Sequence, residues 1–197
     1  EIKNKDGLIC FPYDIFDKEI LCSAKKLKSI STYSVGFDHI DVNYAKKRKI
    51  TIGYTPDVLT NATAELTIGL MMDLLRRITE GDHIIRKGKW NEIFGPFDYV
   101  GTEISGKIIG ILGMGRIGKT VAKKASCLGM HVLYHNRKPI TKTGKAKYVS
   151  LNELFKKSDV ISIHVPYSKN THHMINSKLL NKMKKSSFLI NTSRGKV

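Results

Sequence analysis

The sequence predicts an α/β protein built on doubly wound parallel sheets, and two observations support this prediction. Short apolar runs alternate with helical patterns along the whole chain. Repeated strand–helix units of this kind form parallel sheets that are covered by helices on both faces. The stretch 91–106, which holds three Gly and one Pro, interrupts the alternation and marks the expected boundary between two domains.

The part of the chain before this boundary contains three predicted strands and two short helices. The strands are expected over 7–11, 28–34 and 49–54, and the short helices over 17–26 and 41–48. Because a helix falls between each pair of successive strands, the three strands are expected to lie parallel in one sheet.

A long helix is predicted over 61–79. Asn61 is its expected N-cap, and Arg76 and Arg77 suit the carboxyl end of a helix. One face is formed by four apolar side chains, which Met71 and Leu75 widen: Leu66, Leu70, Leu74 and Ile78. A helix that is apolar around so much of its circumference is expected to be buried in a core or in a subunit interface.

The strand–helix alternation resumes after residue 106. Strands are expected over 107–112, 131–135, 160–165 and 187–191, and helices over 116–128, 151–157 and 177–184. Ser150 and Glu153 have the spacing of a capping box at the start of the second of these helices.

Gly113, Gly115 and Gly118 form a GxGxxG pattern that follows a buried strand and opens a helix, and a second buried strand comes next. The pattern alone is weak evidence, but this complete context makes it a strong dinucleotide fingerprint. Gly113 permits the tight turn, Gly115 lets the backbone approach a pyrophosphate, and Gly118 lets the helix pack closely on the strand. The pyrophosphate is expected at the amino end of the helix. This part of the chain is therefore predicted to be a Rossmann-type domain.

Asn136 stands where such domains usually carry the Asp or Glu that binds the ribose 2′-hydroxyl of NAD. Arg137 and Lys138 follow directly. A carboxylate here would repel a 2′-phosphate, whereas a neutral amide and two cations would attract it. We therefore expect NADPH to be the preferred cofactor, with NADH as the second choice. The alternative is that Arg137 and Lys138 form only a solvated turn.

The composition bears on the expected partners. The chain has 41% apolar residues and a formal net charge of +17. Its lysines are scattered in pairs, so we expect them to be solvated and expect no nucleic-acid partner, although charge-driven binding of nucleic acid stays an alternative. No apolar run is long enough to span a bilayer and no secretory leader opens the chain, so no membrane partner is expected.

Cys10, Cys22 and Cys127 are odd in number, far apart and without CxxC spacing. This pattern argues against a disulfide framework and against a metal site, and it favours a reducing, cytoplasmic compartment. We expect all three to be small buried side chains.

Five segments, in order along the chain, support a family resemblance: "SVGFDHIDV", "GYTPDVLTNATAELTIGLMMDLLRR", "GKIIGILGMGRIG", "HVPYSKNTHHMI" and "FLINTSRG". With them the chain resembles the D-isomer-specific 2-hydroxyacid dehydrogenases over nearly its whole length. Within that family it is most similar to the glyoxylate/hydroxypyruvate reductases, chiefly through "YTPDVLT" and "HNRK". The resemblance implies hydride transfer from NADPH to a small 2-oxo acid such as glyoxylate or hydroxypyruvate, which gives the D-2-hydroxy acid.

The resemblance also implies two domains with the cofactor between them, both incomplete in this chain. A flavodoxin-like substrate-binding domain is expected over 1–98, and the nucleotide-binding domain over 99–197. A homodimer that forms through the nucleotide-binding domains is implied as well.

The residues that the resemblance implies for the cofactor fall into three groups. They are Gly113, Gly115, Arg116, Ile117 and Gly118 at the pyrophosphate, Val165 and Pro166 along the dinucleotide, and Thr192 and Ser193 at the nicotinamide. Val35 and Gly36 match the loop whose backbone N–H groups bind the substrate carboxylate. For Gly36 the alternative is a plain turn at the end of a strand.

By the same resemblance, Arg194 binds the 2-oxo acid and polarises its carbonyl. A planar guanidinium suits a carboxylate and stabilises the oxyanion that develops as hydride arrives. The alternative is a structural surface arginine. The family takes its proton from a His that is tuned by a Glu, and both belong to motifs beyond the point where this chain stops.

None of the seven His residues matches the motif of the missing proton donor, and His39 is expected to be structural. The chain starts at Glu1 without Met, and we expect the parent protein to extend beyond it and past Val197. The 197-residue chain alone is expected to be inactive. Two other functions stay open: an inactive cofactor-binding interaction module, and an NAD-dependent relative that acts on phosphoglycerate, lactate or formate.

Overall fold

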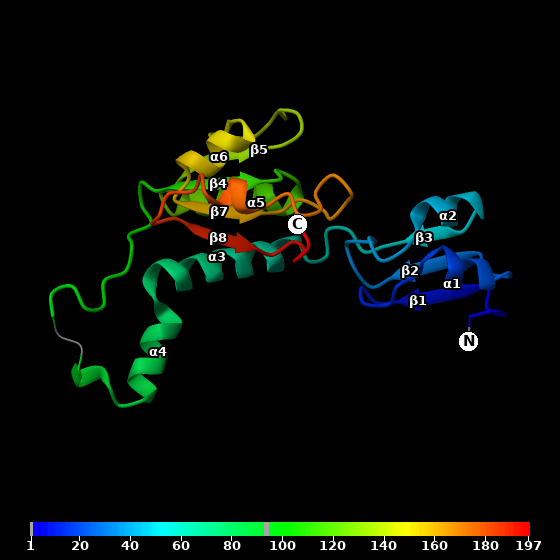
Figure 1. Ribbon diagram of the computed structural model, residues 1–197, viewed down its shortest axis with the longest axis horizontal. Helices are drawn as coiled ribbons and strands as arrows, with labels where there is room; N and C mark the ends of the chain where they lie inside the picture. Colours follow the sequence, from blue (N-terminus) through cyan, green and yellow to red (C-terminus); the bar gives the residue numbers. More distant parts are fainter. Residues whose placement is uncertain (1, 93–94) are drawn as a thin grey trace. The chain divides into compact units, whose positions relative to one another are not determined.

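The computed structural model describes residues 2–92 and 95–197, and it contains two compact units (Figure 1). The first unit is Glu1–Leu59 and the second is Thr60–Val197. Each unit has its own sheet, and all strand pairs in both sheets are parallel. The prediction of an α/β fold with parallel sheets is therefore confirmed.

The first unit has a three-stranded sheet in the order β1-β2-β3. Its elements are β1 (Gly7–Cys10), α1 (Lys18–Ser23), β2 (Ser29–Thr32), α2 (Val42–Lys47) and β3 (Thr51–Gly53). Asp17 and Asp41 cap the two helices, because their carboxylates accept from the Ile20 and Tyr44 N–H groups. The core lies on the face where Leu21 and Ala45 of the helices meet Ile30 of the sheet.

The second unit contains a five-stranded sheet. Its strands are β4 (Ile108–Leu112), β5 (His131–His135), β6 (Lys147–Tyr148), β7 (Val160–Ile163) and β8 (Phe188–Asn191). Their order in the sheet is β6-β5-β4-β7-β8. The first strand, β4, therefore lies in the middle of the sheet, with β5 and β6 on one side of it and β7 and β8 on the other. In open α/β sheets, ligands bind at the carboxyl ends of the strands where the order reverses, here β4 and β7.

Helices cover both faces of this second sheet. On one face, Ile111 and Val132 of the strands pack with Val121 of α5 (Arg116–Cys127). On the other, Leu112 and Ile161 pack with residues of α6 (Leu151–Lys157) and α7 (Ser177–Leu180). The predicted capping box of Ser150 and Glu153 is present at the start of α6.

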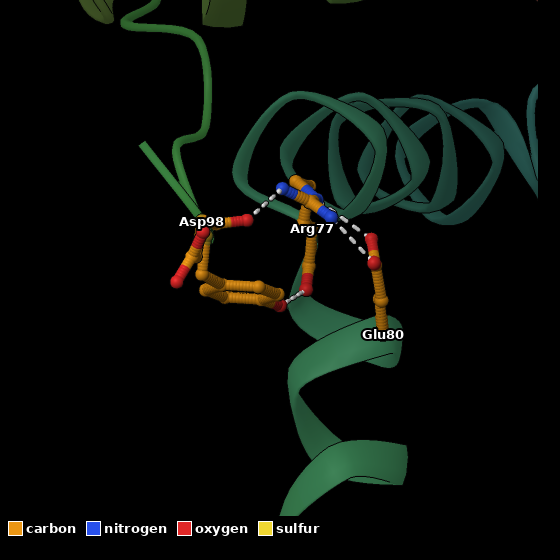
Figure 2. Close-up of polar contacts among 4 residues, drawn as sticks. Arg77, Glu80 and Asp98 are labelled. Carbon is orange, nitrogen blue, oxygen red and sulfur yellow. Dashed lines mark hydrogen bonds and ion pairs between the residues drawn. The ribbon is translucent and has the colours of Figure 1, made fainter. Parts of the chain in front are cut away.

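The long helix predicted over 61–79 is two helices, α3 (Thr60–Arg76) and α4 (Ile78–Arg86). The break falls at Arg77, whose φ of +56° is left-handed and cannot continue a right-handed helix. Figure 2 shows how its side chain is held: Nε donates to Glu80 Oε2 at 2.6 Å and Nη1 donates to the Asp98 carbonyl at 3.3 Å. The Tyr99 hydroxyl donates to the Arg77 carbonyl.

The two faces of α3 differ from the prediction. Asn61 lies inside the helix and is not its N-cap. The buried face consists of Ala64, Thr67, Met71 and Leu75, and the helix packs against α5 and β8. Leu66, Leu70 and Leu74 are 38–58% exposed, so the expected burial of this face in a core is wrong. An interface with another subunit is the alternative that remains.

Two elements differ in small ways from the prediction. The two-residue strand β6 was not predicted, and α7 ends at Leu180 rather than near residue 184. The predicted boundary segment 91–106 lies partly outside the described residues; the compact units divide between Leu59 and Thr60, because α3 packs within the second unit.

Among the described helices, none is long and apolar enough to cross a membrane.

Candidate functional site

The glycine motif that spans the β4–α5 loop and the first turn of α5 has no room for side chains at two of its three glycines. Gly113 has a φ of +99°, and a Cβ there would lie 2.8 Å from the carbonyl carbon and oxygen of His164. A Cβ on Gly118 would clash with the Gly113 carbonyl oxygen. A Cβ on Gly115 would meet nothing within 4 Å. The loop is therefore packed against the sheet, and its backbone is open to a ligand at Gly115.

The amino end of α5 follows this loop directly. Gly115 is the N-cap, and no side chain caps the helix. First-turn N–H groups have no intrahelical acceptor, and they suit a phosphate together with the positive end of the helix dipole. The N–H groups from Gly115 onward therefore suit the phosphates of a dinucleotide, and Gly113 gives the turn that leads to them; the five residues predicted at the pyrophosphate lie together here: Gly113, Gly115, Arg116, Ile117 and Gly118.

The end of β5 is hydrogen-bonded to the same loop. Gly113 N–H donates to the His135 carbonyl at 3.0 Å, and Met114 N–H donates to Asn136 Oδ1 at 2.7 Å. Because an N–H group can pair only with the amide oxygen, this contact fixes the orientation of the Asn136 amide and leaves its NH₂ as a donor. Arg137 and Lys138 follow on the exposed surface.

The residues after β7 border the loop from the other side. A Cβ on Gly113 would lie 2.9 Å from Val165 Cγ1, so Val165 is in contact with the glycine turn, and Pro166 follows on the exposed surface. His164, which the sequence analysis did not single out, has its Nε2 2.8 Å from Ser162 Oγ. Its Nδ1 is buried and has no hydrogen-bond partner within residues 2–92 and 95–197. Burial lowers the pKa of His164 to about 4, so the ring is neutral near pH 7.

The residues after β8 form a hydrogen-bonded turn. Asn191 Oδ1 accepts from Ser193 N–H at 2.9 Å and from Ser193 Oγ at 2.8 Å, and Asn191 Nδ2 donates to the Arg194 carbonyl at 2.9 Å. Thr192 Oγ1 lies 2.9 Å from Thr67 Oγ1 of α3. Arg194 is half-buried, and its Nη1 donates to the Ser193 carbonyl at 3.0 Å. Asn191 therefore holds Ser193 and the Arg194 backbone, and Thr67 holds Thr192. Neither Asn191 nor Thr67 was among the predicted site residues.

All four turns described above lie at one edge of the second sheet. Carboxyl ends of parallel strands share an edge, and the registers place Leu112 opposite His135 and Ile163, and Ile163 opposite Asn191. The structure therefore brings together every residue predicted for the cofactor, from Gly113 to Ser193, together with Arg194. The missed His164 carried one sequence signal, its place at the end of a buried strand.

In the first unit, Val35 and Gly36 follow β2. The Ser34 carbonyl accepts from Thr55 N–H at 3.0 Å, and the Gly36 carbonyl accepts from Ser34 Oγ. Among the described residues, neither the Val35 nor the Gly36 N–H group donates a hydrogen bond. Two consecutive unpaired backbone donors can bind an anion, so the turn is a candidate anion site of its own unit.

The cysteines differ in part from the prediction. Cys10 is buried, and burial raises the pKa of its thiol. Cys22 and Cys127 are exposed, so the prediction that all three are buried is wrong. In the part of the chain that the structure describes, no group of three or more His, Cys, Asp or Glu side chains could hold a metal ion.

Comparisons with known proteins identify the family. Residues 68–197 match the sequence model of the D-isomer specific 2-hydroxyacid dehydrogenase NAD-binding domain. The chain is 47% identical over 200 residues to a glyoxylate reductase of Thermofilum pendens, and this match covers 100% of the chain and 59% of that protein. The chain thus spans about three fifths of that relative's length.

Two solved structures are similar over nearly the whole chain. A D-lactate dehydrogenase from Aquifex aeolicus, complexed with NAD and lactic acid, has a TM-score of 0.94 at 37% identity, covering 99% of this chain and 58% of that one. An acyclic imino acid reductase in complex with NADPH and D-Arg has a TM-score of 0.89 at 33% identity, covering 99% and 62%. These relatives bind NAD in one case and NADPH in the other.

Proposed function

The chain belongs to the D-isomer specific 2-hydroxyacid dehydrogenase family, and from this premise we propose that its parent protein is an NADPH-preferring reductase of small 2-oxo acids. Glyoxylate and hydroxypyruvate are the proposed substrates, and the D-2-hydroxy acid is the product. The observation that supports this most directly is the glycine loop, whose backbone cradle fits a dinucleotide at the switch point of the sheet. The glyoxylate reductase of Thermofilum pendens supports the substrate class.

In this proposal the second unit binds the cofactor and carries Arg194, the catalytic residue of this chain. The strand order of its sheet, counted from β4, is that of a Rossmann-type domain. In the proposal, backbone N–H groups from Gly115 to Gly118 bind the pyrophosphate, Val165 and Pro166 lie along the dinucleotide, and Thr192 and Ser193 lie at the nicotinamide. The bound cofactor supplies the hydride that reaches the carbonyl carbon.

Arg194 is the proposed catalytic residue of this chain. Its guanidinium binds the 2-oxo acid and stabilises the negative charge that develops on the carbonyl oxygen as the carbon receives the hydride. That oxygen must then take a proton, which the proposal assigns to a His and a Glu outside these 197 residues. In the first unit, the Val35 and Gly36 N–H groups are proposed to bind a substrate carboxylate.

The cofactor preference follows from the end of β5. Asn136 keeps its amide oxygen on Met114 N–H, so it offers a donor, not a carboxylate, to the ribose. Arg137 and Lys138 add two cations on an exposed turn that can receive a 2′-phosphate. We therefore propose NADPH over NADH.

A second candidate is an NAD-dependent enzyme of the same family, and one observation favours it. Of the two structures described, the D-lactate dehydrogenase, which contains NAD, has the higher TM-score to this chain, 0.94 against 0.89. Its test is direct, because such an enzyme would reduce pyruvate with NADH, or oxidise lactate with NAD, faster than it would with the phosphorylated cofactor.

We propose a flavodoxin-like substrate-binding domain over 1–98 and a nucleotide-binding domain over 99–197, with the α3 segment of the first packed on α5 and β8 within the second compact unit. We also propose a homodimer in a cytoplasmic setting. The exposed leucine face of α3, made of Leu66, Leu70 and Leu74, supports the homodimer, because a contiguous apolar helix face is typical of a subunit interface.

The experiment that tests the function is a substrate and cofactor screen of the full-length parent protein. Oxidation of NADPH is followed with glyoxylate, hydroxypyruvate, pyruvate and phosphohydroxypyruvate. We expect turnover with the first two, and we expect Arg194→Ala to lower kcat/KM by at least about a hundredfold. Binding of cofactor without turnover of any 2-oxo acid would instead support an inactive interaction module.

A further inference from the structure

Three polar side chains of the first unit form a continuous line of contacts that ends at the candidate anion turn. His39 Nε2 lies 3.0 Å from Thr32 Oγ1, and Thr32 Oγ1 lies 2.8 Å from Ser34 Oγ. Ser34 Oγ in turn donates to the Gly36 carbonyl. Thr32 and Ser34 are buried at 2% and 8% exposure, so water does not compete for these contacts.

The direction of every hydrogen bond in this line can be deduced. The Gly36 carbonyl can only accept, so the single hydroxyl hydrogen of Ser34 is used there. Ser34 must therefore accept from Thr32, which uses the only hydrogen of Thr32. Thr32 must then accept from His39, so the His39 Nε2 carries a proton.

The backbone of His39 is hydrogen-bonded to Phe16, and its ring also lies near the end of β1. The His39 carbonyl accepts from Phe16 N–H at 2.8 Å. Cys10 Sγ lies 3.8 Å from His39 Nε2, a longer and weaker contact than the one to Thr32. The His39 backbone is therefore anchored, and the Nε2 of its ring makes its shorter contact with Thr32 Oγ1.

The line determines what the turn offers to a ligand. It occupies the Gly36 carbonyl, and Thr55 N–H occupies the Ser34 carbonyl at 3.0 Å. The N–H groups of Val35 and Gly36 stay without an acceptor among the described residues. With the Ser34 and Gly36 carbonyls occupied and the Val35 and Gly36 N–H groups unpaired among the described residues, the turn attracts a carboxylate, whereas an unpaired carbonyl oxygen at Ser34 or Gly36 would repel it.

We propose that His39 and Thr32 are positioning residues for the substrate carboxylate, acting through Ser34 on the Val35–Gly36 turn. This inference rests on the proposed function, which assigns the carboxylate to that turn. Neither residue touches the substrate; each donates one hydrogen bond in the line that keeps the Gly36 carbonyl occupied by Ser34 Oγ and so holds it away from the ligand.

The first test does not depend on any substrate. A long-range ¹H–¹⁵N spectrum of the 197-residue chain reports which imidazole nitrogen of His39 carries hydrogen. We expect a protonated Nε2 in the wild-type chain. An unprotonated Nε2 overturns the relay, whatever the protein binds.

The second test measures binding. Glyoxylate is titrated into the ¹⁵N-labelled chain, and the amide resonances of Val35 and Gly36 are followed. We expect Ser34→Ala and Thr32→Val to weaken binding about five- to tenfold, the effect of one lost hydrogen bond, and Thr32→Ser to restore it. Thr51→Val is the matched control, because it makes the same change at an exposed position on β3 and should leave binding unchanged.

The outcomes separate this inference from the proposed function. If the Val35 and Gly36 amides of the wild-type chain do not respond to glyoxylate, the proposed carboxylate site is wrong. If they respond and Ser34→Ala binds as tightly as the wild type, the positioning role is wrong. Equal weakening by Thr51→Val would also contradict it, and Ser34→Ala decides the question if Thr32→Val does not fold.

Discussion

The turn after β4 and the turn after β2 both offer backbone N–H groups beyond a parallel strand, but different forces hold them. The Gly113–Gly118 turn is fixed by steric contact, because Cβ atoms at Gly113 and Gly118 would collide with neighbouring backbone. The Val35–Gly36 turn is fixed by hydrogen bonds from buried hydroxyl groups. Backbone contact tolerates almost no change at its glycines, whereas a hydrogen-bonded turn can be weakened in small steps.

The largest expected effect comes from adding a methyl group to the steric turn. Gly118→Ala is predicted to lower the free energy of unfolding by about 3 kcal/mol, because its Cβ would overlap the Gly113 carbonyl oxygen. Gly115→Ala is the matched control and should change it by less than about 0.5 kcal/mol, since its Cβ meets open space. Urea unfolding measures both, and equal losses would show that packing does not fix this turn.

The next effect concerns His164, whose backbone lies against Gly113. Burial lowers the pKa of His164 from 6.5 to about 4. Between these two pH values His164 is protonated in the unfolded chain and neutral in the folded chain, so protonation stabilises the unfolded state. The free energy of unfolding should therefore fall, by on the order of 2 kcal/mol, as the pH drops from about 6.5 to about 4. His164→Gln should flatten the curve in this window, and an unchanged slope would contradict the buried neutral ring.

A smaller effect is expected where the steric turn meets the end of β5. Arg137→Ala should weaken NADPH binding about tenfold by removing a cation from the 2′-phosphate, and should change NADH binding less than about twofold. Lys145→Ala, an exposed lysine outside this turn, is the control. Equal losses for both cofactors would mean that Arg137 does not recognise the phosphate.

The smallest expected effect is in the hydrogen-bonded turn. Ser34→Ala should cost about 1 kcal/mol of local stability, because it leaves the Gly36 carbonyl without its donor. Amide hydrogen exchange of residues 33–40 measures this locally. A loss as large as that of Gly118→Ala would erase the contrast between the two turns.

The same contrast explains what the sequence could predict. The spacing of Gly113, Gly115 and Gly118 between two strands predicts the steric turn, because the glycines themselves form a local pattern, even though the backbone that Gly113 meets, at His164, is distant in sequence. The relay to Gly36 needs Thr32, on one side of the turn, and His39, on the other, to meet in three dimensions. No local sequence pattern predicts that contact, so the sequence indicates only a structural role for His39 and does not identify Thr32 as the residue that it contacts.

The helices show the same limit. An apolar helical pattern over 61–79 correctly indicates helix, but it does not show the left-handed Arg77, which Glu80, Asp98 and Tyr99 hold from outside the pattern. Nor does it show which apolar face is buried. The buried face combines small and large side chains, Ala64, Thr67, Met71 and Leu75, whereas the equally apolar Leu66, Leu70 and Leu74 stay exposed, so side-chain polarity alone does not distinguish the two faces.

One titration tests the central claim most directly. NADPH and NADH are titrated separately into the 197-residue chain and into its Asn136→Asp variant, which keeps an oxygen for Met114 N–H but adds a charge. We predict tighter binding of NADPH to the wild type and a reversal of that preference in the variant, because a carboxylate repels the 2′-phosphate and accepts from the ribose hydroxyl. Equal or tighter binding of NADH to the wild-type chain would contradict the account.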